Sequence, residues 1–213
     1  MKSKEKLLMA IIAVTLIIVL VGGATFAYWT WRSSTNTSVT FTVQGGSITI
    51  DGGGNITSKS LAPAACTNGT YAIQRQITVT SKNDTGTDMN EILQLKVTAL
   101  TPVTGRTLTE AAKQSIKWAI VKISGTSAYA STTCSSPSAQ GTFENYSTDS
   151  VITLYTATGN AKANATTTSY YKLFIWIDSG YTGTTTVGTT VTDPLQELTL
   201  KLDWQGSMTN ATS

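Results

Sequence analysis

The chain contains no histidine, and this absence excludes several classes of catalytic site. Without an imidazole it cannot form a Ser-His-Asp or Cys-His arrangement, or an HExxH zinc helix. Two cysteines alone cannot complete a zinc shell without carboxylates. No phosphate-binding loop is present, because the glycine clusters are not followed by a helix. We therefore expect no enzymatic activity, no catalytic residue, and no bound cofactor or metal.

Charged residues are also scarce, at 13% of the chain, and they are nearly balanced beyond its start. The first 27 positions hold three of the 15 Lys and Arg residues but only one of the 12 Asp and Glu residues. No basic patch follows, so nucleic acid is not an expected partner. Asp84, Asp88 and Glu91 lie close together around a turn. A solvated hairpin is the favoured interpretation of these carboxylates, and a calcium loop without EF-hand spacing is the alternative.

The N-terminus has the pattern of an export signal. Three lysines within the first six residues precede an apolar run over 7–21, interrupted only by Thr15, which is followed by small residues. Thr25 and Ala27 are the small residues that a signal peptidase requires, so cleavage is expected between Ala27 and Tyr28. Residues 28–213 would then act outside the cell or on its surface.

The alternative is that residues 1–27 remain as a membrane anchor. The stretch 7–27 is close to the length of about 20 residues that spans a bilayer. In that case the basic end stays inside, and residues 28–213 are still outside but tethered to the membrane.

Cys66 and Cys134 are the only cysteines. In an exported chain they are expected to form a disulfide. Closing a loop of this length stabilises the fold by about 4 kcal/mol if the effect is one of chain entropy. The alternative is two buried thiols that never meet.

Beyond the signal, apolar and polar residues alternate with a period of two. In 93–99, for example, Leu93, Leu95 and Val97 alternate with polar residues. Such alternation places one face of a strand on a core and the other in water. The expected strands are 39–43, 47–50, 71–80, 93–99, 117–123, 151–157, 171–177 and 197–204. Residues 28–213 are therefore expected to form one all-β domain, an antiparallel β-sandwich.

One short helix interrupts this pattern. Thr107 and Glu110 have the spacing of a capping box, and the helix should end by about Ser115. Two long polar segments, 124–150 and 178–194, are expected to be loops that are functional or partly disordered.

Tyr28, Trp29 and Trp31 form an aromatic cluster directly after the expected cleavage point. Large apolar groups at a new chain end need a place to be buried. They could form an interfacial belt beside an uncleaved helix. They could equally belong to a strand that completes the sheet of another subunit. The residues themselves do not decide between these two interpretations.

The stretch 20–29, LVGGATFAYW, resembles the signal-to-mature junction of the TasA/camelysin family of bacterial surface proteins. The resemblance continues through 39–41 and 46–50, similar to the strand pair that opens the family's mature domain. The segments 93–97 and 171–178 resemble its core strands loosely. The cysteine pair and the Tyr-Trp-Thr-Trp start have no counterpart in the pattern. The metal-dependent peptidase activity described for camelysins is not implied, because histidine is absent.

The resemblance implies a jelly-roll-like sandwich that polymerises into extracellular fibres of a biofilm matrix. In that family the freed N-terminal strand of one subunit inserts into the next, and 28–43 is the matching segment here. Head-to-tail donation does not close, so it produces a filament of copies of this chain, alone or with other matrix proteins. Signal peptidase would be a transient partner. The candidate assembly residues are Tyr28, Trp29, Trp31, Val39, Phe41 and Val43.

A second function class stays open. If the N-terminal helix is retained, the chain could be a membrane-anchored extracellular binding module that holds a ligand with the loops 124–150 and 178–194.

Overall fold

The computed structural model describes residues 38–43, 45–57, 61–182, 185–187, 190–195 and 197–211. The expected signal segment 1–27, its cleavage point between Ala27 and Tyr28, and Trp29 and Trp31 lie outside the described residues.

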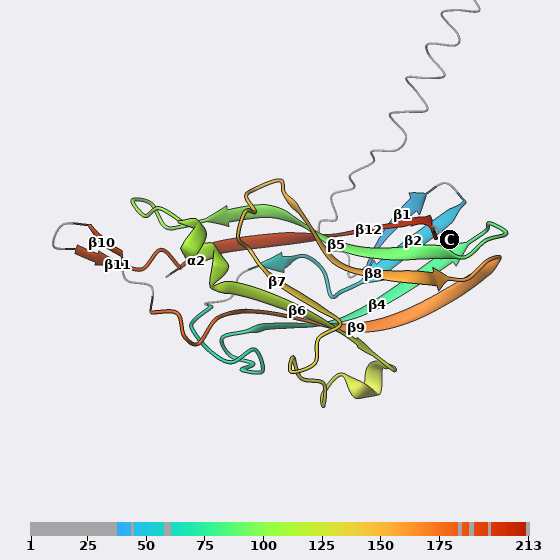
Figure 1. Ribbon diagram of the computed structural model, residues 1–213, viewed down its shortest axis with the longest axis horizontal. Helices are drawn as coiled ribbons and strands as arrows, with labels where there is room; N and C mark the ends of the chain where they lie inside the picture. The colour runs from blue at the N-terminus through green and yellow to red at the C-terminus, as the bar shows by residue number, and fades with distance from the viewer. Residues whose placement is uncertain are drawn as a thin grey trace, which may run out of the picture. The chain divides into compact units, whose positions relative to one another are not determined.

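Two antiparallel sheets form the fold, which confirms the expected all-β sandwich with one short α-helix (Figure 1). The six-stranded sheet runs in the order β1 (Ser38–Val43), β2 (Gly46–Asp51), β4 (Ile73–Asn83), β9 (Ala165–Ile177), β6 (Ile116–Ile123) and β7 (Ala139–Thr142). The four-stranded sheet runs β3 (Ile56–Thr57), β12 (Thr199–Asn210), β5 (Met89–Thr101) and β8 (Val151–Ala161). A separate hairpin joins β10 (Thr185–Val187) to β11 (Thr190–Thr192).

The apolar residues of the alternating pattern fill the space between the sheets. On β5, Leu93, Leu95 and Val97 are buried, while the residues between them are partly exposed. They meet residues such as Leu173 and Ile175 of β9 in a single hydrophobic cluster. Each fully buried side chain of this size stabilises the fold by about 1.5–3 kcal/mol. Burial of these apolar side chains is therefore the main contribution that holds the two sheets together.

All eight expected strands are present, and several are longer than predicted. β9 begins at Ala165 rather than near Tyr171, because the threonines that precede its apolar part continue the ladder with β4. Threonine suits a pleated, half-buried surface. The strands β3, β7, β10 and β11 were not predicted, and each has only two to four residues.

The helix α2 (Glu110–Gln114) lies where it was expected, and its C-cap is Ser115. The predicted capping box is wrong. The N-cap is Thr109, whose hydroxyl accepts a hydrogen bond from the backbone N–H of Ala112. Glu110 is consequently the first helical residue and cannot complete a box with Thr107.

The polar segment 124–150 carries ordered structure rather than a free loop. It contains the 3-10 turn η1 (Thr126–Ala128) and strand β7. The expected disulfide between Cys66 and Cys134 is present, with Cα atoms 6.5 Å apart. The other polar segment, 178–194, contains the β10–β11 hairpin.

Candidate functional site

Strand β1 holds the three candidate assembly residues that the structure describes. It pairs with β2 of the same chain, with Val39 opposite Ile50 and Phe41 opposite Ile48. Val39 is buried, while Phe41 and Val43 are half-buried against the core. In the described part of the chain, no strand pairs with the outer edge of β1. These residues therefore lie on an edge strand of the six-stranded sheet.

The neighbouring edge of the four-stranded sheet is largely uncovered. Strand β12 pairs with β5 along its whole length, but β3 covers its other side only at Lys201 and Leu202. From Trp204 to Asn210, no described strand pairs with that side of β12. An unpaired edge presents backbone N–H and C=O groups that can accept another strand.

The two edges lie against each other across the sandwich, since β1 and β2 both contact β12 (Figure 1). The sheets approach closely here. A Cβ on Gly206 of β12 would lie 2.7 Å from Cδ1 of the buried Ile50. A Cβ on Gly52 would overlap the indole of Trp204, whose Nε1 donates to the carbonyl of Gly54. We name this region, formed by β1, β2 and 204–210 of β12, the open seam.

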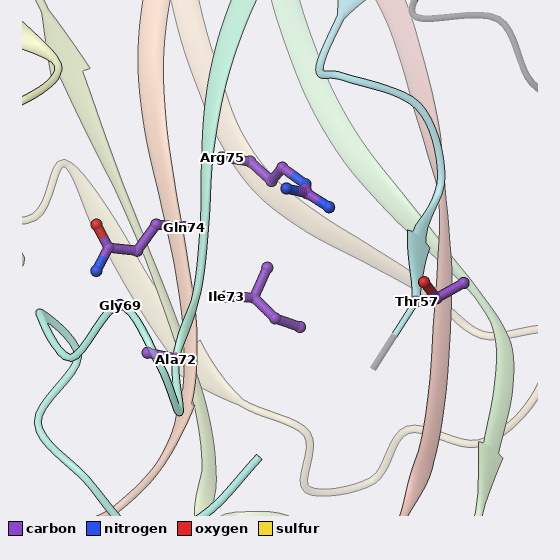
Figure 2. Close-up of a pocket in the computed structure, with 6 residues that line it drawn as sticks. All are labelled: Thr57, Gly69, Ala72, Ile73, Gln74 and Arg75. Atoms are coloured by element: carbon purple, nitrogen blue, oxygen red, sulfur yellow. The ribbon is translucent and has the colours of Figure 1, made fainter. Parts of the chain in front are cut away.

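A small cavity lies at another part of the same side of the sandwich. It has a volume of about 140 Å³. Figure 2 shows Arg75 and Ile73 extending from β4 toward Thr57 of β3, whereas Gln74 points away. The Nε atom of Arg75 is buried and has no hydrogen-bond partner among the described residues. Pockets for drug-sized ligands usually measure about 300–1,000 Å³, so this cavity suits a few water molecules or a small anion.

A polar cluster occupies the core between the two sheets. Its centre is Glu91 of β5, which is only 1% exposed. One carboxylate oxygen accepts from the hydroxyl of Tyr171 at 2.8 Å, and the other accepts from Ser81 Oγ at 2.7 Å. Asn160 Nδ2 donates to that second oxygen at 3.2 Å and to Ser169 Oγ at 2.8 Å. The cluster joins β5 and β8 to β4 and β9.

Electrostatics in this cluster favour a neutral tyrosine. Burial raises the pKa of the Tyr171 phenol, and the charge and hydrogen bond of the Glu91 carboxylate raise it further. Among the described residues, no lysine or arginine forms an ion pair with Glu91. Three neutral donors thus compensate a fully buried carboxylate.

Glu91 was expected to lie around one turn with Asp84 and Asp88, and the structure separates the three. Asp84 pairs with Lys82, and Asp88 with Lys162, both at exposed positions. Within the described ranges, no group of three or more Cys, Asp and Glu residues could hold a metal ion. The sequence could have predicted the burial of Glu91, because this residue lies two positions before Leu93 and therefore on the same, inward face of the strand.

Lys172 anchors the segment 124–150 to the outer face of the six-stranded sheet. It is 3% exposed, and its Nζ donates to the carbonyls of Tyr129 and Thr132 at 2.8 and 2.9 Å. Its ammonium also lies over the rings of Tyr129 and Phe174. Burial lowers the pKa of Lys172. Together with the disulfide, this contact fixes the first half of the segment.

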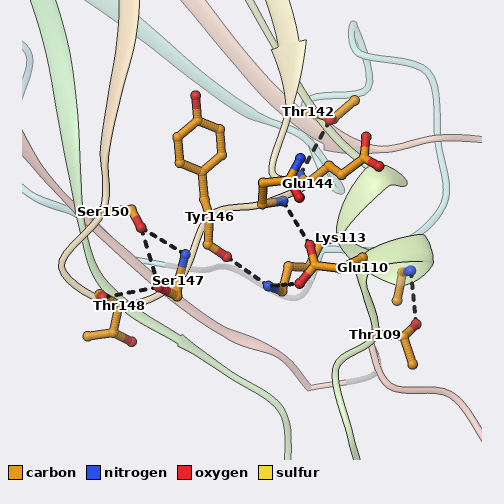
Figure 3. A network of polar contacts seen from close by, with 11 residues as sticks. Thr109, Glu110, Lys113, Thr142, Glu144, Tyr146, Ser147, Thr148 and Ser150 are labelled. Atoms are coloured by element: carbon orange, nitrogen blue, oxygen red, sulfur yellow. Dashed lines mark hydrogen bonds and ion pairs between the residues drawn. The ribbon is translucent and has the colours of Figure 1, made fainter.

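The second half of that segment is fixed to α2 (Figure 3). Glu110 accepts from the backbone N–H of Asn145 at 2.8 Å and pairs with Lys113 at 2.6 Å. Lys113 also donates to the carbonyl of Tyr146 at 2.9 Å. The ion pair with Lys113 holds the pKa of the Glu110 carboxyl below its usual range. These contacts bind backbone groups of the segment and give 124–150 a defined conformation.

No described helix is both long enough and apolar enough to cross a membrane. Comparison of the chain with models of known protein families, and with curated proteins, finds no match.

Proposed function

We propose that this chain is an exported structural protein that assembles head to tail into extracellular fibres or a biofilm matrix by N-terminal strand donation. The observation that carries this proposal is the open seam. There, one side of β12 from Trp204 to Asn210 has no strand paired with it among the described residues, directly beside the edge strand β1. An unpaired strand edge in an extracellular sandwich invites a strand from another copy.

The pairing of β1 with β2 narrows the donor segment. Residues 38–43 already form a hairpin within their own chain. Within the candidate strand 28–43, we therefore propose 28–37, which contains Tyr28, Trp29 and Trp31, as the segment that is donated. A strand of ten residues extends over about 33 Å, long enough to pair with the uncovered part of β12. The half-buried Phe41 and Val43 would anchor its base to the subunit that donates it.

The rival function, a membrane-anchored binding module, has less support. It requires a ligand-holding surface in 124–150 or 178–194, and backbone groups of Tyr129, Asn145 and Tyr146 in the first of these segments already bind the rest of the domain. The cavity beside Arg75 is too small for most organic ligands.

The proposal is tested on the extracellular form of the protein. We expect N-terminal sequencing to find a start at Tyr28 and electron microscopy to show filaments. The matched variant deletes 28–31, and we expect it to be a folded monomer, as judged by circular dichroism and gel filtration. A chain that retains Met1 and stays monomeric in detergent, or filaments at the unmodified level after the deletion, would refute strand donation.

A further inference from the structure

Glu91 and Asn160 of the polar cluster are linked to the surface through a third side chain, that of Lys122. Asn160 Nδ2 donates to Glu91 Oε2 at 3.2 Å, and Lys122 Nζ donates to Asn160 Oδ1 at 3.1 Å. A carboxylate thus contacts the nitrogen of a side-chain amide, while a primary amine contacts the oxygen of the same amide. These are the groups needed to exchange one amide for another: a nucleophile, an acyl carbon and a proton carrier beside the leaving group.

The fold holds these groups together from different sheets. Lys122 is on β6 of the six-stranded sheet, and Asn160 is on β8 of the four-stranded sheet. Lys122 lies opposite Tyr171 in the β6–β9 ladder, so both side chains leave the sheet on its core face. The amide of Asn160 is held further by its hydrogen bond to Ser169. The amine and the amide are therefore neighbours because the sandwich is formed, although 38 positions separate them in the chain.

We propose that Lys122 and Asn160 condense to an intramolecular isopeptide bond, with Glu91 as the catalytic acid and base. The neutral amine of Lys122 attacks Cγ of Asn160, and the C=O electrons move onto Oδ1. Glu91 accepts a proton from the attacking nitrogen and delivers it to Nδ2. The carbonyl re-forms, the Cγ–Nδ2 bond breaks and ammonia leaves. The products are a secondary amide between the two sheets, one ammonia molecule and the regenerated Glu91 carboxylate.

Proximity makes this step feasible, although amides are stable toward amines in solution. Positioned reacting groups behave as if one were present at very high effective concentration. Lys122 is the exposed member of the three. Its amine must lose a proton before it attacks, so the bond should form gradually after folding rather than during it. The cross-link does not depend on the fibre proposal, since all of its groups belong to one chain.

Mass spectrometry of the folded, purified full chain tests the proposal directly. We expect an intact mass lower than that of the disulfide-bonded chain by one ammonia molecule after prolonged incubation. Protease digestion should release a branched peptide in which Lys122 is joined to Asn160. Lys122→Arg retains the charge but cannot form the bond, so it should show the full mass. The control Lys117→Arg, on the same strand, should lose ammonia as the unmodified chain does.

Glu91→Gln separates the proton transfer from the positioning of the groups, because it has nearly the same shape and retains one acceptor oxygen, for either Tyr171 or Ser81, but cannot carry the proton. We expect it to fold and to form the bond at least tenfold more slowly. Succinimide formation at an asparagine also releases ammonia, but it joins no peptides and persists in Lys122→Arg. The full mass in folded unmodified protein would overturn the proposal, as would an unchanged mass loss in Lys122→Arg. If Glu91→Gln does not fold, the two lysine variants still decide the question.

Discussion

At the scale of single residues, this sandwich is distinguished by polar side chains at core-facing positions of its strands. Glu91 and Arg75 occupy positions where the alternation of their strands would place an apolar residue. Glu91 is compensated by three hydrogen bonds, whereas Arg75 has a buried Nε atom without a partner in the described residues. Burying an unpaired polar atom costs about 1–3 kcal/mol. A water molecule in the cavity that Arg75 lines would satisfy this atom and remove that cost.

Tyr171 should make stability depend on pH in the alkaline range. Its pKa in the folded protein is raised by burial and by Glu91. A tyrosine in an unfolded chain ionises at about pH 10. Above this pH the unfolded chain loses a proton that the folded chain retains. The free energy of unfolding therefore falls as pH rises beyond about 10, and Tyr171 contributes no slope below that pH.

The variant Tyr171→Phe should reduce this alkaline slope by up to about 1.4 kcal/mol per pH unit. Urea unfolding at several pH values on both sides of pH 10 measures it. Tyr181, whose pKa is raised by burial and by Asp193, continues to contribute in the variant. The control Tyr71→Phe alters an exposed tyrosine and should retain the slope of the unmodified chain. Equal slopes in Tyr171→Phe and the unmodified chain would contradict the assignment.

At the scale of elements, the segment 124–150 shows how a long polar stretch can be ordered without a core of its own. The disulfide and Lys172 fasten its first half to the outer face of the six-stranded sheet. Glu110 and Lys113 of α2 fasten its second half. Each contact joins residues that are far apart in sequence. The segment is therefore ordered only when the sheets beneath it have formed.

Replacing Cys66 and Cys134 together by serine should destabilise the domain by about 4 kcal/mol, because the bond closes a loop of 68 positions. Urea unfolding of the variant and of the unmodified chain, with and without a reducing agent, measures this difference. Limited proteolysis should cut the variant first between η1 and β7. The reducing agent should destabilise only the unmodified chain. Coincident unfolding curves for variant and oxidised parent would exclude a stabilising role for the bond.

At the scale of the whole molecule, the sandwich is closed by its core and open at one seam. The core cluster and the Glu91 hydrogen bonds join the two sheets. At the seam, the side of β12 that faces away from β5 has no strand paired with it over 204–210 in the part of the chain that the structure describes. The fold thus buries its core within one chain and still has an edge at which a further strand could pair.

A synthetic peptide of residues 28–37 should bind at the seam of a chain that lacks 28–37 and should block filament growth from the intact chain. Backbone pairing with β12 and burial of Trp29 and Trp31 supply the affinity. Fluorescence of a labelled peptide measures binding, and light scattering measures growth. A matched peptide with both tryptophans changed to serine should bind at least tenfold more weakly. Equal binding of the two peptides would exclude the aromatic residues as anchors.

The sequence predicted the strands well because their signal is local. Alternation over 93–99 places Leu93, Leu95 and Val97 on one face whatever lies opposite, so the strand follows from pleat geometry alone. The disulfide was equally predictable, since two cysteines allow only one intramolecular pairing. The capping box failed because the helix begins two residues later than the Thr107 spacing requires: Thr109 is the N-cap, and Glu110 is the first helical residue.

The sequence by itself determined the all-β class and the inward faces of the strands, because both depend on the alternation of neighbouring residues. It also determined the pairing of the two cysteines, because two cysteines can form only one disulfide within a chain. The tertiary structure decided what the polar residues do. It placed Glu91 against Tyr171 and Asn160, Lys172 beneath Tyr129, and the uncovered side of β12 beside β1. These pairs join residues distant in sequence, and only the order and register of the strands bring them together.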